Sequence, residues 1–288
     1  MKRFKFVMPD DFNLFCFGDR HLGSQFSCES SWKKTVQSLH EPYDGLNADK
    51  NFAIDHGDIL EGITIDDPRY DPLVHKDSVL KQIEDAKKSL LRIQNKLLLG
   101  LDGNHLRSRS LKRFGSVAEN IYKSSGIDYG TWSSHITYVD RKYREMFRHF
   151  CTHGRRGLNS TLPDPERRRS SLESSLRKVL RDKFGDCALM TRGHTHQIIT
   201  AKPVRSLYLY MAENEIKHQY KYFIQQDTSF YIPPSLRYYA STGSFFKLYG
   251  DDGAVSYAEE HDYDPLEIGY VVVKVRDQKI VGIDEVIL

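Results

Sequence analysis

Residues of the types that bind metal ions occur in five short groups along the chain. Each group adjoins a glycine, and glycine permits the tight turns and close backbone approach that a metal site needs. The groups contain Asp19 and His21, then Asp58, then Asn104, then His153, and finally His194 and His196. Imidazole together with carboxylate and amide oxygen suits Mn, Fe, Zn or similar divalent ions, and the absence of cysteine from these five groups argues against a structural zinc site.

Such a set of ligands can hold two metal ions. A carboxylate can bridge two cations while imidazoles occupy their remaining sides. Two ions about 3.5–4 Å apart can clamp both the attacking and the leaving oxygen of an in-line displacement. The sequence therefore predicts a metal-dependent enzyme that hydrolyses a phosphate ester.

The five groups follow apolar runs that are typical of buried strands. The expected strands span Phe12–Phe17 and residues 52–55, 97–101, 148–152 and 187–191. Helices are expected between them at residues 30–40, 76–96, 111–123 and 165–183. Open α/β sheets place their sites beyond the carboxyl ends of the strands, so all five groups should converge on one crevice.

Each motif alone is a weak signal. D-x-H at Asp19 and His21 is more often structural, and G-N-H or G-H-x-H should each arise by chance in roughly a few percent of such chains. The alternative interpretation is a set of scattered polar turns with no common site. The presence of all five groups in order, each directly after an apolar strand, favours a shared site.

The pattern becomes β-rich after about residue 197. Strands are expected at residues 206–210, 221–224, 236–240 and 270–275, with a closing hairpin around Asp277 and Gln278. Alternation followed by β-rich sequence predicts an α/β fold with two packed mixed sheets flanked by helices. We expect one domain over residues 1–288, with a basic helical insertion at about 155–183 and a β-rich C-terminal part at about 197–288.

Composition and charge limit the choice of partners and location. The net charge of +3 is too small to imply a nucleic-acid or membrane partner by itself. The four cysteines form no C-x-x-C pair, and no run of about 18 apolar residues occurs, so we expect a cytoplasmic protein with no membrane partner. The basic stretch at 155–181 could guide a phosphate backbone, or it could be the solvated face of a helix.

Together the five groups resemble the calcineurin-like metallophosphoesterase superfamily over about residues 14–196. The resemblance implies a metallophosphoesterase-type β-sandwich flanked by helices and a dinuclear metal centre. It assigns Asp19, His21 and His196 to the first metal ion. It makes Asp58 the bridge between the ions and gives Asn104, His153 and His194 to the second ion.

The same resemblance assigns roles beside the metals. His105 matches the catalytic histidine of the family, which could protonate the leaving oxygen or stabilise developing charge. Glu61 occupies the place of an acidic residue that orients this histidine, and the expected nucleophile is a metal-bound hydroxide. Arg107 and Arg109 could contact the substrate phosphate, or they could cap the next helix or lie in solvent.

Several positions depart from known branches of the superfamily. Protein Ser/Thr phosphatases have arginines where this chain has Gly62 and Asp102, which argues against that branch. Purple acid phosphatases have a tyrosine ligand near the second group, and this chain has none there. Many relatives have an acidic residue where Leu106 follows G-N-H, so either Glu61 orients His105 alone or His105 is less constrained.

The stretch 19–24 (DRHLGS) resembles the first motif of DNA-repair nucleases and of bacteriophage phosphoesterases in this superfamily. This favours a phosphodiesterase that acts on nucleic acid such as DNA, with two divalent ions of which Mn is preferred to Fe, Zn, Ni or Mg. An enzyme encoded by a phage would work in the host cytoplasm. A small-molecule phosphoesterase acting on a nucleotide, cyclic nucleotide or phosphomonoester is one alternative, and a catalytically silent metal-binding scaffold is another.

Overall fold

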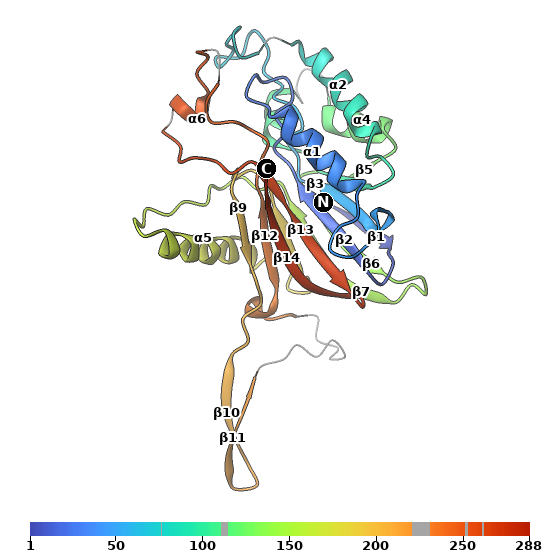
Figure 1. The fold of residues 1–288 in the computed structure, drawn as a ribbon, viewed down its shortest axis with the longest axis vertical. Helices are drawn as coiled ribbons and strands as arrows, with labels where there is room; N and C mark the ends of the chain where they lie inside the picture. Colours follow the sequence, from blue (N-terminus) through green and yellow to red (C-terminus); the bar gives the residue numbers. More distant parts are fainter. Residues whose placement is uncertain (76, 111–114, 221–230, 251–252, 261) are drawn as a thin grey trace.

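Two six-stranded sheets pack against each other in the computed structural model (Figure 1). The structure describes residues 1–75, 77–110, 115–220, 231–250, 253–260 and 262–288. The first sheet has the order β1 (Lys2–Val7), β6 (Ser133–Val139), β7 (Glu145–Thr152), β8 (Leu189–Arg192), β12 (Tyr238–Thr242) and β9 (Ile198–Ala201). The second has the order β14 (Lys279–Ile287), β13 (Gly269–Arg276), β2 (Phe12–Phe17), β3 (Asn51–Asp55), β4 (Leu97–Gly100) and β5 (Asp128–Tyr129).

Both sheets are mixed, and their parallel parts determine where the site lies. In the second sheet β2, β3, β4 and β5 run parallel, so the residues that follow them emerge at one edge. In the first sheet β7, β8 and β12 run parallel in the same way. The loops that carry the five ligand groups therefore leave the two sheets at their carboxyl edges.

Helices cover the outer faces of the two sheets (Figure 1). The second sheet is covered by α1 (Glu29–Leu39), α2 (Val79–Leu91) and α4 (Val117–Ser124), and the first by α5 (Pro165–Leu180). Shorter elements are η1 (Ala48–Lys50), the π-helix η2 (His105–Ser110), η3 (Pro234–Leu236) and α6 (Tyr257–Glu260). Ser78 and Asp164 cap α2 and α5 by accepting hydrogen bonds from backbone N–H groups, as is usual at helix starts.

The β2 strand shows why the core has this arrangement. Phe12, Leu14 and Cys16 point between the two sheets, where they pack with residues of both. Phe15 and Phe17 point to the other side and pack beneath the helices. Because both faces of β2 are buried, the sequence shows no alternation and is apolar except for Asn13, whose amide donates a hydrogen bond to Asn51.

The expected elements correspond closely to observed ones in the parallel parts of the sheets. The five expected strands are β2, β3, β4, β7 and β8, and the expected hairpin is β13–β14 with Asp277 and Gln278 at positive φ in its turn. The expected helix at 111–123 is shorter, since α4 begins at Val117, and residues 111–114 lie outside the described residues. The expected strand at 221–224 also lies outside them.

Several observed strands have no counterpart among the expected elements. These are β1, β5, β6, β9 and β11. In β1 every second residue is exposed, so short alternation among charged residues hides the strand. The strand expected at 206–210 exists, but it lies outside both large sheets.

That strand belongs to a separate hairpin, which we call the arm. The arm consists of β10 (Leu207–Ala212) and β11 (Glu215–Tyr220), which pair with each other and with no further strand in the described part of the chain. Its turn residues Glu213 and Asn214 both have positive φ, as a two-residue hairpin turn requires. Figure 1 shows the arm projecting away from the body of the molecule.

Two further features bear on the expected environment. No helix within the described ranges is both long enough and apolar enough to span a membrane. The four cysteines are all buried and unbridged.

Candidate metal centre

The five ligand groups converge at one place between the carboxyl edges of the two sheets. Asp19 and His21 follow β2, Asp58 follows β3, and Asn104 follows β4. His153 follows β7, while His194 and His196 follow β8. Their potential ligand atoms fall into sets whose members lie within 4.8 Å of one another: Asp19, His21 and His196; His21, Asp58 and His105; and Asp58, His153 and His194.

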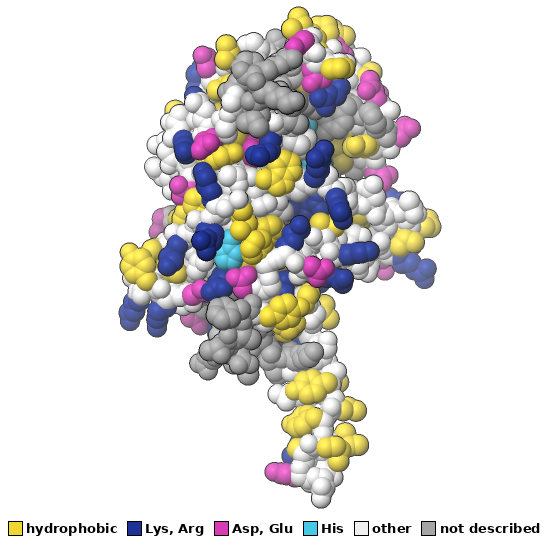
Figure 2. All heavy atoms as spheres, turned by 180° about the vertical axis from the view of Figure 1, so that it is seen from behind, with side chains coloured by type: hydrophobic (Ala, Val, Ile, Leu, Met, Phe, Trp, Pro, Cys, Tyr) yellow, Lys and Arg dark blue, Asp and Glu magenta, His cyan; other side chains and the backbone are white. Residues whose placement is uncertain are grey.

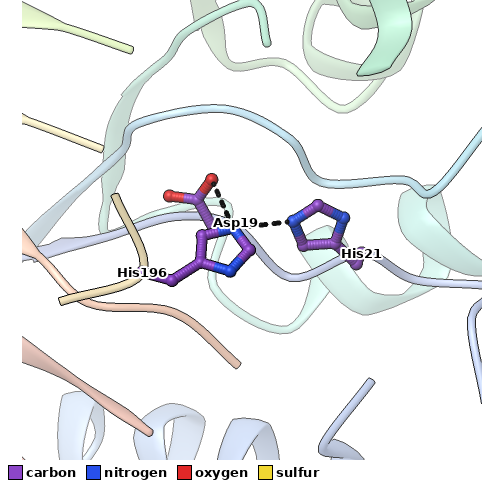
Figure 3. Close-up of side chains that lie close together, drawn as sticks. All are labelled: Asp19, His21 and His196. Atoms are coloured by element: carbon purple, nitrogen blue, oxygen red, sulfur yellow. Dashed lines mark hydrogen bonds and ion pairs between the residues drawn. The ribbon is translucent and has the colours of Figure 1, made fainter. Parts of the chain in front are cut away.

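The first set contains Asp19, His21 and His196 (Figure 3). His21 Nδ1 lies 2.8 Å from a carboxylate oxygen of Glu61 and donates to it, so Nε2 carries the lone pair. This Nε2 lies 3.2 Å from His196 Nε2. Asp19 Oδ1 is buried without a hydrogen-bond partner among the described residues, and His196 Nε2 is 3.5 Å from it. A cation between these atoms would satisfy all three.

The set that contains Asp58, His153 and His194 brings acceptor atoms together. His153 Nδ1 donates to the carbonyl oxygen of His56 at 2.8 Å, which leaves the lone pair on Nε2. That Nε2 lies 2.9 Å from Asn104 Oδ1 and 3.2 Å from Asp58 Oδ2. Three acceptor atoms that face one another in a buried place require a positive charge between them.

Either a proton or a metal ion can supply that charge. Burial favours the neutral ring of His153, but the facing carboxylate of Asp58 outweighs it and raises the pKa of His153 to about 9. Metal ions compete with protons for such ligands, since imidazole binds metal only through a free lone pair. The arrangement of acceptors therefore fits a divalent ion at this position.

Asp58 lies between the two sides of the site. Its Oδ1 accepts the backbone N–H of His105 at 2.9 Å, and its Oδ2 faces His153. Burial opposes the charge on Asp58, but His153 and the other histidines lower its pKa far below the usual range. A Cβ at Gly103 would lie 1.9 Å from Asp58 Oδ1, so this close approach requires glycine.

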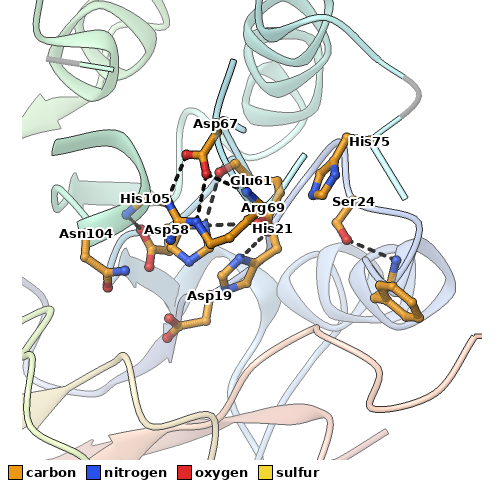
Figure 4. A network of polar contacts seen from close by, with 12 residues as sticks. Asp19, His21, Ser24, Asp58, Glu61, Asp67, Arg69, His75, Asn104 and His105 are labelled. Atoms are coloured by element: carbon orange, nitrogen blue, oxygen red, sulfur yellow. Dashed lines mark hydrogen bonds and ion pairs between the residues drawn. The ribbon is translucent and has the colours of Figure 1, made fainter. Parts of the chain in front are cut away.

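Glu61 contacts two histidines (Figure 4). One carboxylate oxygen is 2.8 Å from His21 Nδ1, and the other is 3.3 Å from His105 Nδ1. His105 Nδ1 also lies 3.1 Å from the backbone oxygen of Glu61. Burial opposes the charge on Glu61, but His105 and His21 lower its pKa well below the usual range. Glu61 thus fixes an expected metal ligand and the expected catalytic histidine together.

Most of the expected ligands have an unusual backbone conformation. Asp19, His21, Asp58, His194 and His196 all have positive φ, between 48° and 73°. Residues other than glycine rarely adopt positive φ, and such backbone strain concentrates at functional sites. The loops therefore hold these side chains in place at a cost in backbone energy.

A cavity with a volume of about 1010 Å³ opens over the cluster. Asp58, Asn104, His105, His194 and His196 line it. Its described lining includes two arginines, Arg69 and Arg155. Arg69 binds Asp67 through two nitrogens at 2.9 and 2.8 Å, and Figure 4 places it beside Glu61 and His105. No motif marks Arg69 in the sequence.

The two arginines expected at the substrate are placed differently. Arg107 lies 3.3 Å from Asp102 Oδ2 and has a half-exposed side chain. It is not among the described residues that line the cavity. The side chain of Arg109 lies outside the described part of the structure, so its expected role stays a prediction.

A chain of hydrogen bonds runs from the site into the space between the sheets. Tyr138 donates to His149 Nδ1 at 3.2 Å, and His149 Nε2 donates to Thr191 Oγ1 at 2.7 Å. Thr191 donates in turn to His56 Nε2 at 2.6 Å, and His56 Nδ1 lies 3.3 Å from the oxygen of Phe17. Burial lowers the pKa of His56 to about 4 and that of His149 well below its usual range, so both rings stay neutral.

No protein-family model matches this chain, and no curated protein matches it.

Proposed function

We propose that this protein is a member of the calcineurin-like metallophosphoesterase superfamily that hydrolyses a phosphate ester with two divalent metal ions. The observation that supports this most strongly is the position of Asp58 between two histidine-rich sets of ligand atoms. On each side, buried acceptor atoms face one another in a way that a cation would relieve. The two sheets flanked by helices agree with the sandwich that the superfamily would require.

The chain's own residues have distinct parts in the proposed reaction. One ion would be held by Asp19, His21 and His196, the other by Asn104, His153 and His194, with Asp58 shared. Bound divalent ions, for which manganese is our first choice, polarise phosphoryl oxygens and lower the pKa of water. His105, oriented by Glu61, would give a proton to the leaving oxygen.

We favour a phosphodiester of nucleic acid as the substrate. The cavity is large, and Arg69 and Arg155 lie on its wall, where guanidinium groups could bind flanking phosphates. A small phosphate ester is the second candidate, and one observation favours it. Glu260, Asp262 and Asp264 also line the cavity, and these carboxylates would repel a long polyanion.

The decisive experiment compares the parent with Asp58→Asn on end-labelled single- and double-stranded DNA in the presence of Mn²⁺. Asp182→Asn is the matched control, because this substitution makes the same chemical change at a side chain that is 80% exposed. We expect cleavage by the parent and by Asp182→Asn, and a loss of more than about 100-fold in Asp58→Asn.

Other outcomes separate the candidates. If the parent and the control cleave a small phosphodiester or nucleotide but not DNA, the substrate is a small phosphate ester and not nucleic acid. Failure of the Mn²⁺-loaded parent on DNA, small diesters and monoesters alike would refute the proposed function. Equal rates in the parent and Asp58→Asn would show that another site does the chemistry.

A further inference from the structure

The arm has one apolar face and one polar face. In its register Leu207 pairs with Tyr220, Leu209 with His218, and Met211 with Ile216, so these side chains share one side of the hairpin. We call this side the apolar face. Leu209, Met211 and Ile216 are 68%, 68% and 71% exposed. Figure 2 shows apolar side chains along the length of the arm.

The opposite face is suited to water. It carries Tyr208, Tyr210, Glu215, Lys217 and Gln219, which alternate with the residues of the apolar face. Tyr208 donates a hydrogen bond to Gln219 across the strands. This one-sided pattern is that of a sheet that buries one face against another layer.

The described structure offers no such layer. The arm pairs with no other described strand and projects from the body. An isolated two-stranded hairpin is marginally stable in water, and monomeric proteins rarely expose a contiguous apolar surface of this kind. The apolar face therefore requires a covering partner for the arm to be stable.

The charges of the arm exclude several partners. Between Leu207 and Tyr220 the chain has two acidic residues, Glu213 and Glu215, and one basic residue, Lys217. Nucleic acid and anionic membrane surfaces are bound by clusters of Lys and Arg, which the arm lacks. The apolar face itself carries no Asp, Glu, Lys or Arg. Its partner is expected to be another uncharged apolar protein surface.

A second copy of this chain supplies such a surface. A twofold axis brings identical patches together, and an uncharged apolar patch is complementary to itself. Two apolar faces at the observed exposures would bury on the order of 1,000 Å² in total, which is the lower limit of the area that a specific interface buries. We propose that two copies of this protein associate through their arms, with the apolar faces packed as a two-layer sandwich.

The position of the arm makes such a pair compatible with two working sites. Thr242 pairs with Ile198 at the end of β12 and β9 that lies near His196, whereas Tyr239 pairs with Ala201 at the other end. The arm follows Ala201, so it is attached at the end of these strands away from the cluster. Association through the arm leaves both cavities open, and it does not depend on the proposed function.

The test is the mass of the full chain in solution, measured by sedimentation between 1 and 100 µM. These concentrations span the range in which an interface of about this size should associate. We expect a mass twice that of the 33.4 kDa chain at the upper concentrations. The variant Leu209→Glu, Ile216→Lys changes only the apolar face and keeps the net charge, and we expect its dissociation constant to rise at least about 100-fold.

A matched control places the same charges on the other face. Tyr208→Glu, Gln219→Lys should dimerise like the parent, because these side chains face water. Hydrogen exchange on the unmodified protein gives a second measurement, with amides of the arm more protected at 100 µM than at 1 µM. A parent that remains monomeric at 100 µM, an apolar-face variant that still dimerises, or a control that dissociates equally would each overturn the proposal.

Discussion

The Nδ1 protons of His21 and His153 are each held by a neighbour on the side of the ring away from the cluster. Glu61 takes the Nδ1 proton of His21, and the carbonyl of His56 takes that of His153. Both rings therefore direct Nε2, the atom that would bind a metal ion, to the interior of the site. This arrangement of partners is the one that histidine ligands need, since the tautomer is fixed before an ion arrives.

Arg69 is the residue at which the structure adds most to the sequence. Under the proposed function it would bind a phosphate group of the substrate, because it lies on the cavity wall beside His105 and is held by Asp67. Arg69→Gln should raise KM by about 10-fold or more, the loss of one charge-assisted hydrogen bond, with a smaller change in kcat.

Arg107→Gln is the control for this change, because Arg107 is bound to Asp102 away from the cavity lining. Steady-state kinetics on the same substrate would compare the two variants. Equal increases in KM for both would count against a specific part for Arg69.

At this scale the sequence predicted the residues that its motifs contain. Asp19, Asp58 and His153 meet as expected because strand ends in parallel sheets converge. Arg69 was not predicted, since it lies in a loop without periodicity, and its pairing with Asp67 is visible only in the structure. Arg107 follows the G-N-H group in sequence, but Asp102 draws its side chain elsewhere.

At the scale of elements, Thr191 of β8 links a histidine of the first sheet to a histidine in a loop of the second sheet by hydrogen bonds. Its hydroxyl accepts from His149 and donates to His56, which precedes the expected bridge by two residues. Thr191→Val keeps the shape but leaves both ring nitrogens without this partner. We expect a loss of about 2–4 kcal/mol in the free energy of unfolding.

Urea unfolding at neutral pH measures this loss, and Thr191→Ser is the matched variant that retains the hydroxyl. The serine variant should lose about 1 kcal/mol, the contribution of one buried methyl group. If the Thr191→Val variant proves as stable as the Thr191→Ser variant, the chain of hydrogen bonds contributes little to the stability of the fold.

Strands could be predicted from the sequence where both of their faces are buried. The run Phe12–Phe17 is apolar except for Asn13, because one side packs on helices and the other on the opposite sheet. The strands β1 and β6 escaped prediction because polar and charged residues interrupt their apolar positions. In β1 the exposed positions include Arg3 and Lys5, and in β6 Ser133, His135 and Thr137 are only partly buried. Pairing with a distant strand, as between Lys2 and Ser134, leaves no local trace in sequence.

At the scale of the molecule, the candidate centre connects the two sheets. Asp19, His21, Asp58 and Asn104 come from loops of the second sheet, while His153, His194 and His196 come from the first. An ion bound to both groups should stabilise the packing of the sheets. At a Mn²⁺ concentration 100 times the dissociation constant, the free energy of unfolding should rise by about 2.7 kcal/mol, which corresponds to about 5–10 °C in Tm.

Thermal unfolding with Mn²⁺ and with EDTA tests this linkage. The parent and Asp182→Asn should both melt at a lower temperature in EDTA, and the difference should largely vanish in Asp58→Asn. A parent whose Tm is the same in both solutions would argue against a metal centre, whatever its activity.

The positive φ angles of the ligand loops also have a consequence for how such a protein changes over generations. Each of Asp19, His21, Asp58, His194 and His196 occupies a backbone position that glycine would occupy with less strain. Replacement by glycine therefore offers a more relaxed chain at the expense of a ligand. In a lineage in which the site had no use, nothing would oppose that exchange. Such a lineage would tend to lose these five side chains early and gain stability as it did so.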